Sequence, residues 1–463
     1  MARTDPDPSA VVTPPSAEAG PSVEAPVDLT AAPEAAVPLV PPEIMAQSLR
    51  EYMQAWWLRI RSGESGMLPV ILALVIIVVV FEVISPNHVF LTAGNIVNLF
   101  QQSAVFMVLG MAEIFALLLG EIDLSIGYWG AVGGVIAVQL VQPRTTNWPW
   151  VPAIIVALLA IALVGAVQGT LVTRLRLPSF IVTLAGLLIG NGVMLIVLAF
   201  GPFSGYPSLN GLSVNLRALH DLMWGTVSPE VGWVVMIVVV GLLSLSLFFR
   251  DTRRRRSGLV APPVSLTMIK IAGMAAVGVT VVAICNLNRA AVGTLEGVPW
   301  VIFIVFGVLG AWTFLLQRTR YGRYMYAIGG NPEAARRAGI NVTMVRTWAF
   351  ALCLLTAAIG GVLYASLIGG MSNNFPGGQY VLYAVAAAVI GGTSLFGGRG
   401  KMSHGVVGGL VIGGIYNGMY LLGLAVQWEF IVTGFVLLFA VTIDSLSRGT
   451  TVGGAARRIF GQR

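Results

Sequence analysis

The sequence predicts an all-α, polytopic membrane protein with about twelve transmembrane helices, some of them short or broken. Three observations support this fold class. Of the 463 residues, 56% are hydrophobic and only 10% are charged. Mean hydropathy is +0.85, which is far above that of a soluble domain. Finally, apolar stretches follow one another along the chain, many of them close to the ~20 residues that a helix needs to cross a bilayer.

The chain is divided by composition into an N-terminal tail, an interfacial segment, a transmembrane domain and a basic tail: residues 1–42, 43–66, 67–446 and 447–463. The first tail is rich in Pro, Ala and acidic residues, which is typical of disorder, and it lacks the basic start and apolar core of a signal peptide. In the interfacial segment, Trp56 and Trp57 lie beside Arg59 and Arg61. Such a pattern is typical of an amphipathic helix at the membrane surface.

The predicted spans, in order, are Met67–Ile84, Ser103–Leu119, Ile126–Val141, Val151–Thr173, Ser179–Phe200, Val231–Phe249, Ser265–Ile284, Trp300–Leu316, Trp348–Gly369, Tyr380–Phe396, Gly405–Leu422 and Trp428–Ile443. Several are shorter than the ~20 residues of an upright helix. We therefore expect helices that are broken inside the protein, where other segments satisfy the freed backbone groups.

Basic residues predict the orientation of these spans. If residues 317–340 are cytoplasmic, alternation of sides also places the following basic residues inside: Arg174, Arg176, Arg253–Arg256, Arg399, Lys401, Arg448, Arg457 and Arg458. The outer loops then hold only Arg144, Arg217 and Arg289. This distribution satisfies the positive-inside rule and predicts that both termini are cytoplasmic. Topology thus explains the net charge of +7, and no nucleic-acid partner is expected.

The basic loop at residues 317–340 contains a short helix whose two ends are specified by the sequence. Asn331 can cap the first turn, and Pro332 suits the first helical position. Glu333 favours the positive end of the helix, and Gly339 can adopt the left-handed conformation just past the last turn. An isolated helix of about two turns is marginal in water. Its spacing alone leaves two interpretations: the helix lies on the protein's own surface, or it docks on a partner.

Four acidic residues lie within or at the ends of apolar stretches: Glu82, Glu113, Glu121 and Asp123. Ionisable groups at membrane depth are costly and therefore suggest function. Glu121 and Asp123 belong to GEIDLSIG at residues 120–127, where flanking glycines and a possible helix cap at Ser125 indicate a break between two half-helices. Such a break can bind ions or hydroxyl-rich solutes. The alternative is that Asp123 merely caps the second half-helix.

Glycines cluster at residues 391–400 and again at Gly408, Gly409, Gly413 and Gly414. We interpret them as sites of close helix packing and of a tight chain reversal, because no strand precedes them to form a phosphate-binding loop. Residues 121–134 and 391–409 are weakly alike and could form an internal repeat. Tryptophans near span ends are interpreted as an interfacial belt and not as sugar-stacking platforms: Trp148, Trp150, Trp224, Trp300 and Trp428.

Motifs of enzymatic chemistry are absent from the sequence. It contains no HExxH, GxSxG or Walker A pattern, and its three histidines are widely separated. Cys285 and Cys353 match no disulfide or metal spacing and are interpreted as packing residues. The sequence therefore predicts no catalytic residue, no metal site and no cofactor bound by this chain. Movement of a solute would then depend on an ion gradient or on energy supplied by a partner.

Four motifs together carry a family resemblance: EIDLSIG at 121–127, PSFIVTLAG at 178–186, YGRYMYAIGGNPEAARRAGI at 321–340 and VIGGTSLFGG at 389–398. From about Met67 to Arg448 the chain resembles the permease subunits of bacterial ATP-binding cassette monosaccharide importers, with the closest similarity to the xylose type. Ribose-type relatives usually have glycine at the position of Glu121 and lack much of the region from about Arg250 to Pro299.

The resemblance implies a permease homodimer in the bacterial cytoplasmic membrane, with two ATPase subunits that bind ATP and Mg²⁺ and a sugar-binding protein outside. It implies import of xylose or a related monosaccharide by alternating access, with no enzymatic activity in this chain. The residues implied in coupling to the ATPase are Asn331, Pro332, Glu333, Ala334, Ala335, Arg336 and Gly339. Those implied along the translocation path are Glu121, Asp123, Ser125, Ser179, Thr183 and Asn191.

Two functions of another class stay open beside this one. In an ion-coupled secondary transporter, Glu121 and Asp123 would take up protons. A membrane scaffold or receptor would transport nothing. Neither accounts for the capped helix together with the four motifs, and the genes beside this one discriminate between the classes.

Overall fold

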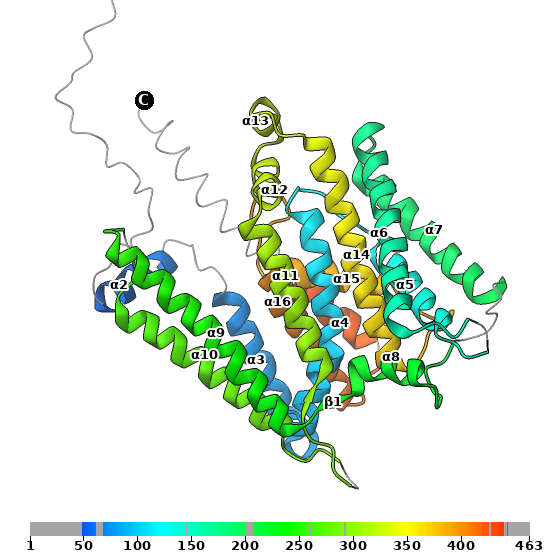
Figure 1. Cartoon of the computed structure of the whole chain (residues 1–463), viewed down its shortest axis with the longest axis horizontal. Coiled ribbons are helices and arrows are strands. Elements are labelled where there is room, and N and C mark those ends of the chain that lie inside the picture. The colour runs from blue at the N-terminus through cyan, green and yellow to red at the C-terminus, as the bar shows by residue number, and fades with distance from the viewer. Residues whose placement is uncertain are drawn as a thin grey trace, which may run out of the picture.

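The computed structural model shows a bundle of long helices that run in roughly the same direction (Figure 1). It describes residues 49–61, 68–144, 146–200, 207–259, 261–290, 293–425 and 427–438, together with residue 442. The two tails predicted at residues 1–42 and 447–463 lie outside this part of the chain. Within the predicted interfacial segment, α2 spans Leu49–Arg61.

Each predicted span corresponds to one apolar helix of the described residues: α3 (Leu68–Ile84), α4 (Ala93–Leu117), α5 (Ile126–Leu140), α6 (Trp150–Arg174), α7 (Ser179–Phe200), α9 (Pro229–Arg256), α10 (Val264–Cys285), α11 (Trp300–Arg318), α14 (Val342–Ile368), α15 (Gly377–Ile390), α16 (Met402–Leu421) and Gln427–Leu438. Among the described residues, seven of these helices are both long and apolar enough to cross a membrane: α4, α6, α7, α9, α10, α11 and α14. The all-α, polytopic fold class is confirmed. The sides on which the termini lie stay a prediction.

Several shorter elements complete the chain: η1 (Pro86–His88), α8 (Val214–Trp224), β1 (Thr226–Val227), β2 (Val298–Pro299), α12 (Arg320–Gly330) and α13 (Pro332–Arg337). Strands β1 and β2 pair antiparallel, with Thr226 opposite Pro299. In Figure 1, α12 and α13 lie at one end of the bundle, and α8 and β1 lie at the other. We call these the α13 end and the α8 end.

The helices divide into a buried centre and an exposed periphery. The most apolar stretch of α4 is 83% buried and that of α14 is 67% buried, whereas α9 and α10 reach only 6% and 11%. α14 packs against α4, α5 and α6, while α16 packs against α4 and α15. α9 and α10 pack on each other, beside α2 and α3 at the edge of the bundle (Figure 1). The functional site is therefore sought around α4 and α14.

Small residues allow the central helices to approach closely, as the glycine clusters predict. A Cβ at Gly361 would lie 1.8 Å from the carbonyl oxygen of Gly130, and one at Gly408 would lie 1.8 Å from that of Ala387. Side chains larger than hydrogen are thus excluded where α14 meets α5 and where α16 meets α15. Close backbone contact of this kind is how helices gain packing energy inside a membrane, where burial of apolar surface contributes little.

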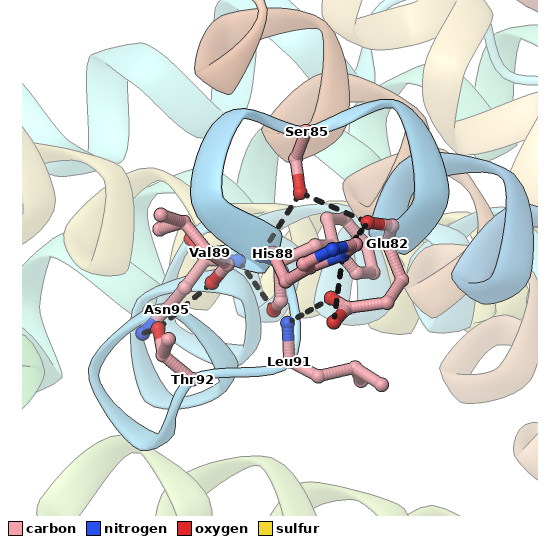
Figure 2. Close-up of polar contacts among 8 residues, drawn as sticks. Glu82, Ser85, His88, Val89, Leu91, Thr92 and Asn95 are labelled. Atoms are coloured by element: carbon pink, nitrogen blue, oxygen red, sulfur yellow. Dashed lines mark hydrogen bonds and ion pairs between the residues drawn. The ribbon is translucent and has the colours of Figure 1, made fainter.

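Glu82 has a structural role in the turn between α3 and α4 (Figure 2). Its Oε2 accepts a hydrogen bond of 2.9 Å from the backbone N–H of Leu91, and His88 Nδ1 lies 3.8 Å from its other carboxylate oxygen. The Thr92 side chain caps the start of α4 by accepting from the N–H of Asn95. Of the four acidic residues singled out by the sequence, Glu82 therefore stabilises a turn at the α8 end.

Candidate functional site

α13 begins as the sequence predicts. Asn331 Oδ1 accepts a hydrogen bond of 2.9 Å from the N–H of Ala334, and Pro332 occupies the first helical position. An N-cap of this kind satisfies one of the four N–H groups that a helix leaves without an intrahelical partner, and its loss typically costs about 1 kcal/mol.

The other end of α13 is closed by a Schellman motif. Gly339 has φ +81°, in the left-handed region. Its N–H bonds to the carbonyl of Arg336 at 3.0 Å, and the N–H of Ile340 bonds to that of Ala335 at 3.1 Å. Asn341 then caps α14, because its Oδ1 accepts from the N–H of Met344. Only residues 338–341 separate α13 from α14, and every one of them belongs to one of the two caps.

α13 presents charge on an exposed surface. Ala335 is its one buried residue and joins the main apolar core, whereas the rest of the helix is exposed. Glu333 lies 2.8 Å from Arg336 and 3.5 Å from Arg337. Because exposed ion pairs contribute little to stability, these three side chains are free to exchange partners with another protein.

α12, a helix that was not predicted, fixes α13 to the bundle. The Thr319 hydroxyl accepts from the N–H of Gly322, and one face of the helix buries Met325 and Ile328. The amphipathic pattern of residues 320–330 was the available signal, since buried positions recur every three residues.

Contacts of α12 join it to α4 and α14. A Cβ at Gly329 would lie 1.8 Å from the Leu118 carbonyl oxygen, so α12 lies directly against the end of α4. The Tyr326 hydroxyl donates to the carbonyl of Gly400, and the Tyr321 hydroxyl donates to that of Val345. Burial raises the pKa of both phenols, which keeps them protonated as donors.

The break predicted at residues 120–127 is present, between α4, which ends at Leu117, and α5, which begins at Ile126. The Leu118 carbonyl accepts a hydrogen bond of 2.9 Å from the N–H of Gly398, and Gly120 has φ +73°. Gly398 belongs to the loop between α15 and α16. The loop between α15 and α16 is thus hydrogen-bonded to the start of the break at the α13 end.

Glu121 pairs with Arg346 in the first turns of α14. The distance between Oε1 and Nη2 is 3.4 Å, and the side chains are 15% and 25% exposed. Since only residues 338–341 lie between α13 and α14, this ion pair connects the break to the helix that directly follows α13.

Asp123 is fully buried next to the start of α5. Its Oδ1 accepts from the Ser125 N–H at 2.9 Å and from the Ser125 hydroxyl at 2.6 Å, and Gln168 of α6 lies 3.1 Å from that hydroxyl. Ser125 occupies the N-cap position of α5, but its side chain makes no capping bond. The prediction that Ser125 caps the second half-helix is therefore wrong, because its hydroxyl donates to Asp123 instead.

A second carboxyl group, that of Glu113 in α4, lies beside Asp123. Its Oε1 accepts from the Asp123 N–H at 3.2 Å, while Glu113 Oε2 and Asp123 Oδ2 have no partner of good hydrogen-bond geometry. The Cys353 thiol is close enough to Asp123 to interact with it. A buried carboxyl group needs a proton, a cation or further donors. Within the described residues, however, no group of three His, Cys, Asp or Glu side chains could hold a metal ion.

α7 brings part of the remaining predicted set to the break. Thr183 is buried, and its hydroxyl lies 2.9 Å from the Ser179 carbonyl and 3.2 Å from that of Ile122. Ser179 is half-buried one turn away, whereas Asn191 is half-buried two turns beyond Thr183. Asp123, Ser125 and Thr183 are therefore neighbours, and Asn191 lies farther along α7. Gln168 and Cys353 also belong here, but no local motif marks them.

These features define a multi-pass membrane protein with an exposed, doubly capped helix at one end and a buried polar break behind it. The sequence family described as "Branched-chain amino acid transport system / permease component" matches residues 95–441. The chain belongs to this family and is a transport permease component of the bacterial cytoplasmic membrane.

The chain aligns with nearly the whole length of three proteins of Escherichia coli. The xylose transport system permease protein is 33% identical over 384 residues, which cover 82% of this chain and 92% of that protein. The ribose import permease protein is 29% identical over 399 residues, covering 86% and 96%. The D-allose transport system permease protein is 30% identical over 373 residues, covering 81% and 90%. No solved structure matches the chain.

Proposed function

We propose that this chain is the permease subunit of an ATP-binding cassette importer that carries a monosaccharide, with xylose as the first candidate. Its relatives are named for xylose, ribose and allose, three sugars of similar size. In the proposed assembly, two copies of the chain form the membrane channel, two ATPase subunits bind ATP and Mg²⁺, and an extracytoplasmic sugar-binding protein delivers the sugar.

The observation that carries this proposal is the doubly capped, exposed helix α13. A short helix that must pass on a displacement has to resist fraying, and the caps at Asn331 and Gly339 provide that resistance. In the proposal, the coupling surface that enters the ATPase subunit comprises Asn331, Pro332, Glu333, Ala334, Arg336 and Gly339. Ala335, by contrast, is buried and holds the helix on its own bundle.

The mechanism in this proposal is alternating access. When ATP brings the ATPase subunits together, each α13 moves as a rigid body and α14 follows, because the connecting residues are fixed by caps. The Glu121–Arg346 pair then transmits the movement to the break. Asp123, Ser125, Ser179, Thr183 and Asn191 belong to the translocation path that opens to one side or the other.

Co-purification tests the proposal. The chain is purified in detergent with the ATPase subunit encoded beside its gene, and the experiment is repeated with Glu333→Arg. We expect the parent to bind and the variant to lose at least ten-fold in affinity, because hydrogen-bonded charges at an interface contribute several kcal/mol. Glu230→Arg is the matched control, because Glu230 is also an exposed glutamate but lies in the first turn of α9, away from α13. Absence of binding by the parent would contradict the proposal.

The second candidate is a proton-coupled transporter that uses Glu121 and Asp123. The observation in its favour is the pair of buried carboxyl oxygens without partners, on Glu113 and Asp123. Against it, Glu121 is already paired with Arg346. Uptake that collapses with a protonophore but survives ATP depletion would favour this candidate.

A further inference from the structure

A cluster of aromatic rings lies inside the bundle, apart from the predicted site residues. Its members are Phe106 of α4, Tyr364 of α14, Phe375 just before α15, Tyr380 and Tyr383 of α15, and Tyr416 of α16. Neighbouring ring centroids are 4.7–6.2 Å apart. Four of the six rings carry a hydroxyl group, and we call Tyr364, Tyr380, Tyr383 and Tyr416 the tyrosine cluster.

Polar groups of the tyrosine cluster face one another. Tyr383 donates its hydroxyl to Glu429 Oε1, and Gln379 Nε2 donates to the same hydroxyl. Glu429 comes from the last described helix and is 7% exposed. The phenol groups of Tyr380 and Tyr416 are close enough to interact electrostatically with this carboxylate.

Three hydroxyl groups in the tyrosine cluster make no hydrogen bond within the described residues: those of Tyr364, Tyr380 and Tyr416. Their oxygens are not among the buried side-chain oxygens that lack a partner, so each of them reaches open space. Tyr380 is nevertheless only 9% exposed. An unpaired hydroxyl group that reaches open space is available to a ligand, because binding does not break a hydrogen bond within the protein. Three such hydroxyl groups among aromatic rings, beside a carboxylate, therefore favour a ligand that carries several hydroxyl groups.

The tyrosine cluster continues the row of polar groups that begins at the break. α5 has 15 residues and α15 has 14, so each is too short to cross a bilayer alone. Their first turns meet, since a Cβ at Gly127 would lie 2.0 Å from the Gly377 carbonyl oxygen. Tyr128, three residues after Ser125, lies 6.2 Å from Phe375 between ring centroids. Half-helices that start side by side inside a bundle are typical of transporter binding sites.

We propose that the tyrosine cluster, with Gln379 and Glu429, binds the monosaccharide on its way through the permease. This inference rests on the proposed function and extends it from a path to a contact site. A sugar ring has apolar C–H faces and a rim of hydroxyl groups. Sites for such ligands combine aromatic surfaces with a few fixed polar groups, and tyrosine supplies both.

Each group has a role in this site. The rings of Tyr364 and Tyr380, which cross at 79°, form two adjoining walls, one against an apolar face of the sugar and the other against its edge. The unpaired phenol groups donate to sugar hydroxyls or accept from them. Glu429 accepts from a sugar hydroxyl through its second carboxylate oxygen, while the first stays bound to Tyr383. Residues that hydrogen-bond a hydroxyl discriminate strongly against ligands without it.

The test uses the complete transporter in proteoliposomes, with radiolabelled D-xylose, D-ribose and D-allose as probes. Tyr364→Phe, Tyr380→Phe and Tyr416→Phe each keep the ring and remove one unpaired hydroxyl. We expect each to lower uptake of the preferred sugar about 3- to 10-fold, as for the loss of one hydrogen bond. ATP hydrolysis stimulated by the sugar-loaded binding protein, and the melting temperature, should stay within the range of the parent. Glu429→Gln keeps the shape of the side chain and should alter the preference among the three sugars.

Tyr420→Phe is the control, because Tyr420 lies on the same helix as Tyr416 but is 70% exposed. Uptake equal to the parent in all three phenylalanine variants and in their combination would overturn the inference, because a cluster that only packs does not need the hydroxyl groups. Uptake that falls only in step with melting temperature would also overturn it. If the parent itself takes up none of the three sugars, the proposed function fails instead.

Discussion

α13 and the break at residues 118–125 are both polar interruptions among apolar helices, but they are specified differently. The caps of α13 are made by residues within six positions of the helix, so its geometry is written in one short stretch. The break is held by partners from distant elements: Arg346 bonds Glu121, Gly398 bonds Leu118, and Gln168 lies beside Ser125. The geometry of an exposed helix such as α13 can thus be encoded by neighbouring residues, whereas the geometry of a buried break depends on the whole bundle.

The largest effect is expected where α12, the helix that precedes α13, meets the break. Gly329→Leu forces side-chain atoms into the Leu118 carbonyl, because even a Cβ would lie at 1.8 Å. We expect no folded protein by fluorescence-detected size exclusion, since backbone clashes in a packed core cannot relax. Gly330→Leu is the control, because the adjacent position is open to 4 Å. A normal yield of the Gly329 variant would show that α12 does not need this contact.

Two substitutions of Asp123 distinguish a capping role from a role in transport. Asp123→Asn keeps an oxygen for the Ser125 N–H and removes the charge, whereas Asp123→Ala removes both. We expect both variants to lower sugar uptake several-fold while the ATPase subunit still co-purifies, and only the alanine to lose about 1–2 kcal/mol of stability. Normal uptake by the asparagine variant would mean that Asp123 only caps the start of α5. Loss of assembly with the ATPase subunit in the alanine variant would support the same conclusion.

Gly339→Val tests the C-terminal cap of α13 through backbone strain alone. The position has φ +81° and no atom within 4 Å of a new Cβ, so only the backbone conformation opposes the change. A left-handed residue with a Cβ costs about 1–2 kcal/mol, and a β-branched one costs more. We expect uptake to uncouple from ATP hydrolysis while membrane insertion is unchanged. Gly339→Asn tolerates the left-handed region better and should couple more normally. Normal uptake by the valine variant would refute rigid coupling.

Asn331→Ala should have the smallest effect. It removes the bond to the Ala334 N–H, which typically contributes about 1 kcal/mol, and the rest of α13 is unchanged. We expect a two- to five-fold weaker complex with the ATPase subunit by titration, and Asn331→Asp should restore it by supplying another capping oxygen. An equal loss in both variants would mean that the side chain contacts the partner directly.

The sequence was sufficient for features that depend on near neighbours. Length and apolarity located every span, and most of the helix ends fall within a few residues of the prediction. Four ends differ by six residues or more: α4 begins at Ala93 and not at Ser103, α9 ends at Arg256 and not at Phe249, α14 begins at Val342 and not at Trp348, and α15 ends at Ile390 and not at Phe396. The polar side chains in the first turns of α4, including Asn95 and Gln101, hid its start. α8 was not predicted, because it is short and only weakly apolar. The pairing of β1 with β2 was not predicted, because the strands have two residues each and lie about 70 residues apart in the sequence.

Buried contacts could not be predicted to the same extent. Gln168 reaches Ser125 and Cys353 reaches Asp123 from other helices, and no local pattern marks either residue. Glu429 did have a signal, because it is an acidic residue at the second position of a predicted span, and it was overlooked. The tryptophans at span ends can be recognised in the sequence, whereas the tyrosine cluster is assembled from three separate helices, α14, α15 and α16.

α14 touches all three regions in turn. It follows α13, carries Arg346 beside the break, and brings Tyr364 to the tyrosine cluster near its other end. A helix of 27 residues is about 40 Å long, and Tyr364 lies about 33 Å from its start. With a fulcrum at the first turn, a tilt of about 5° therefore moves the phenol by about 3 Å, the length of one hydrogen bond. Mechanically, α14 acts as a lever: a small rotation at its first turn makes or breaks single hydrogen bonds at Tyr364, near its other end inside the bundle.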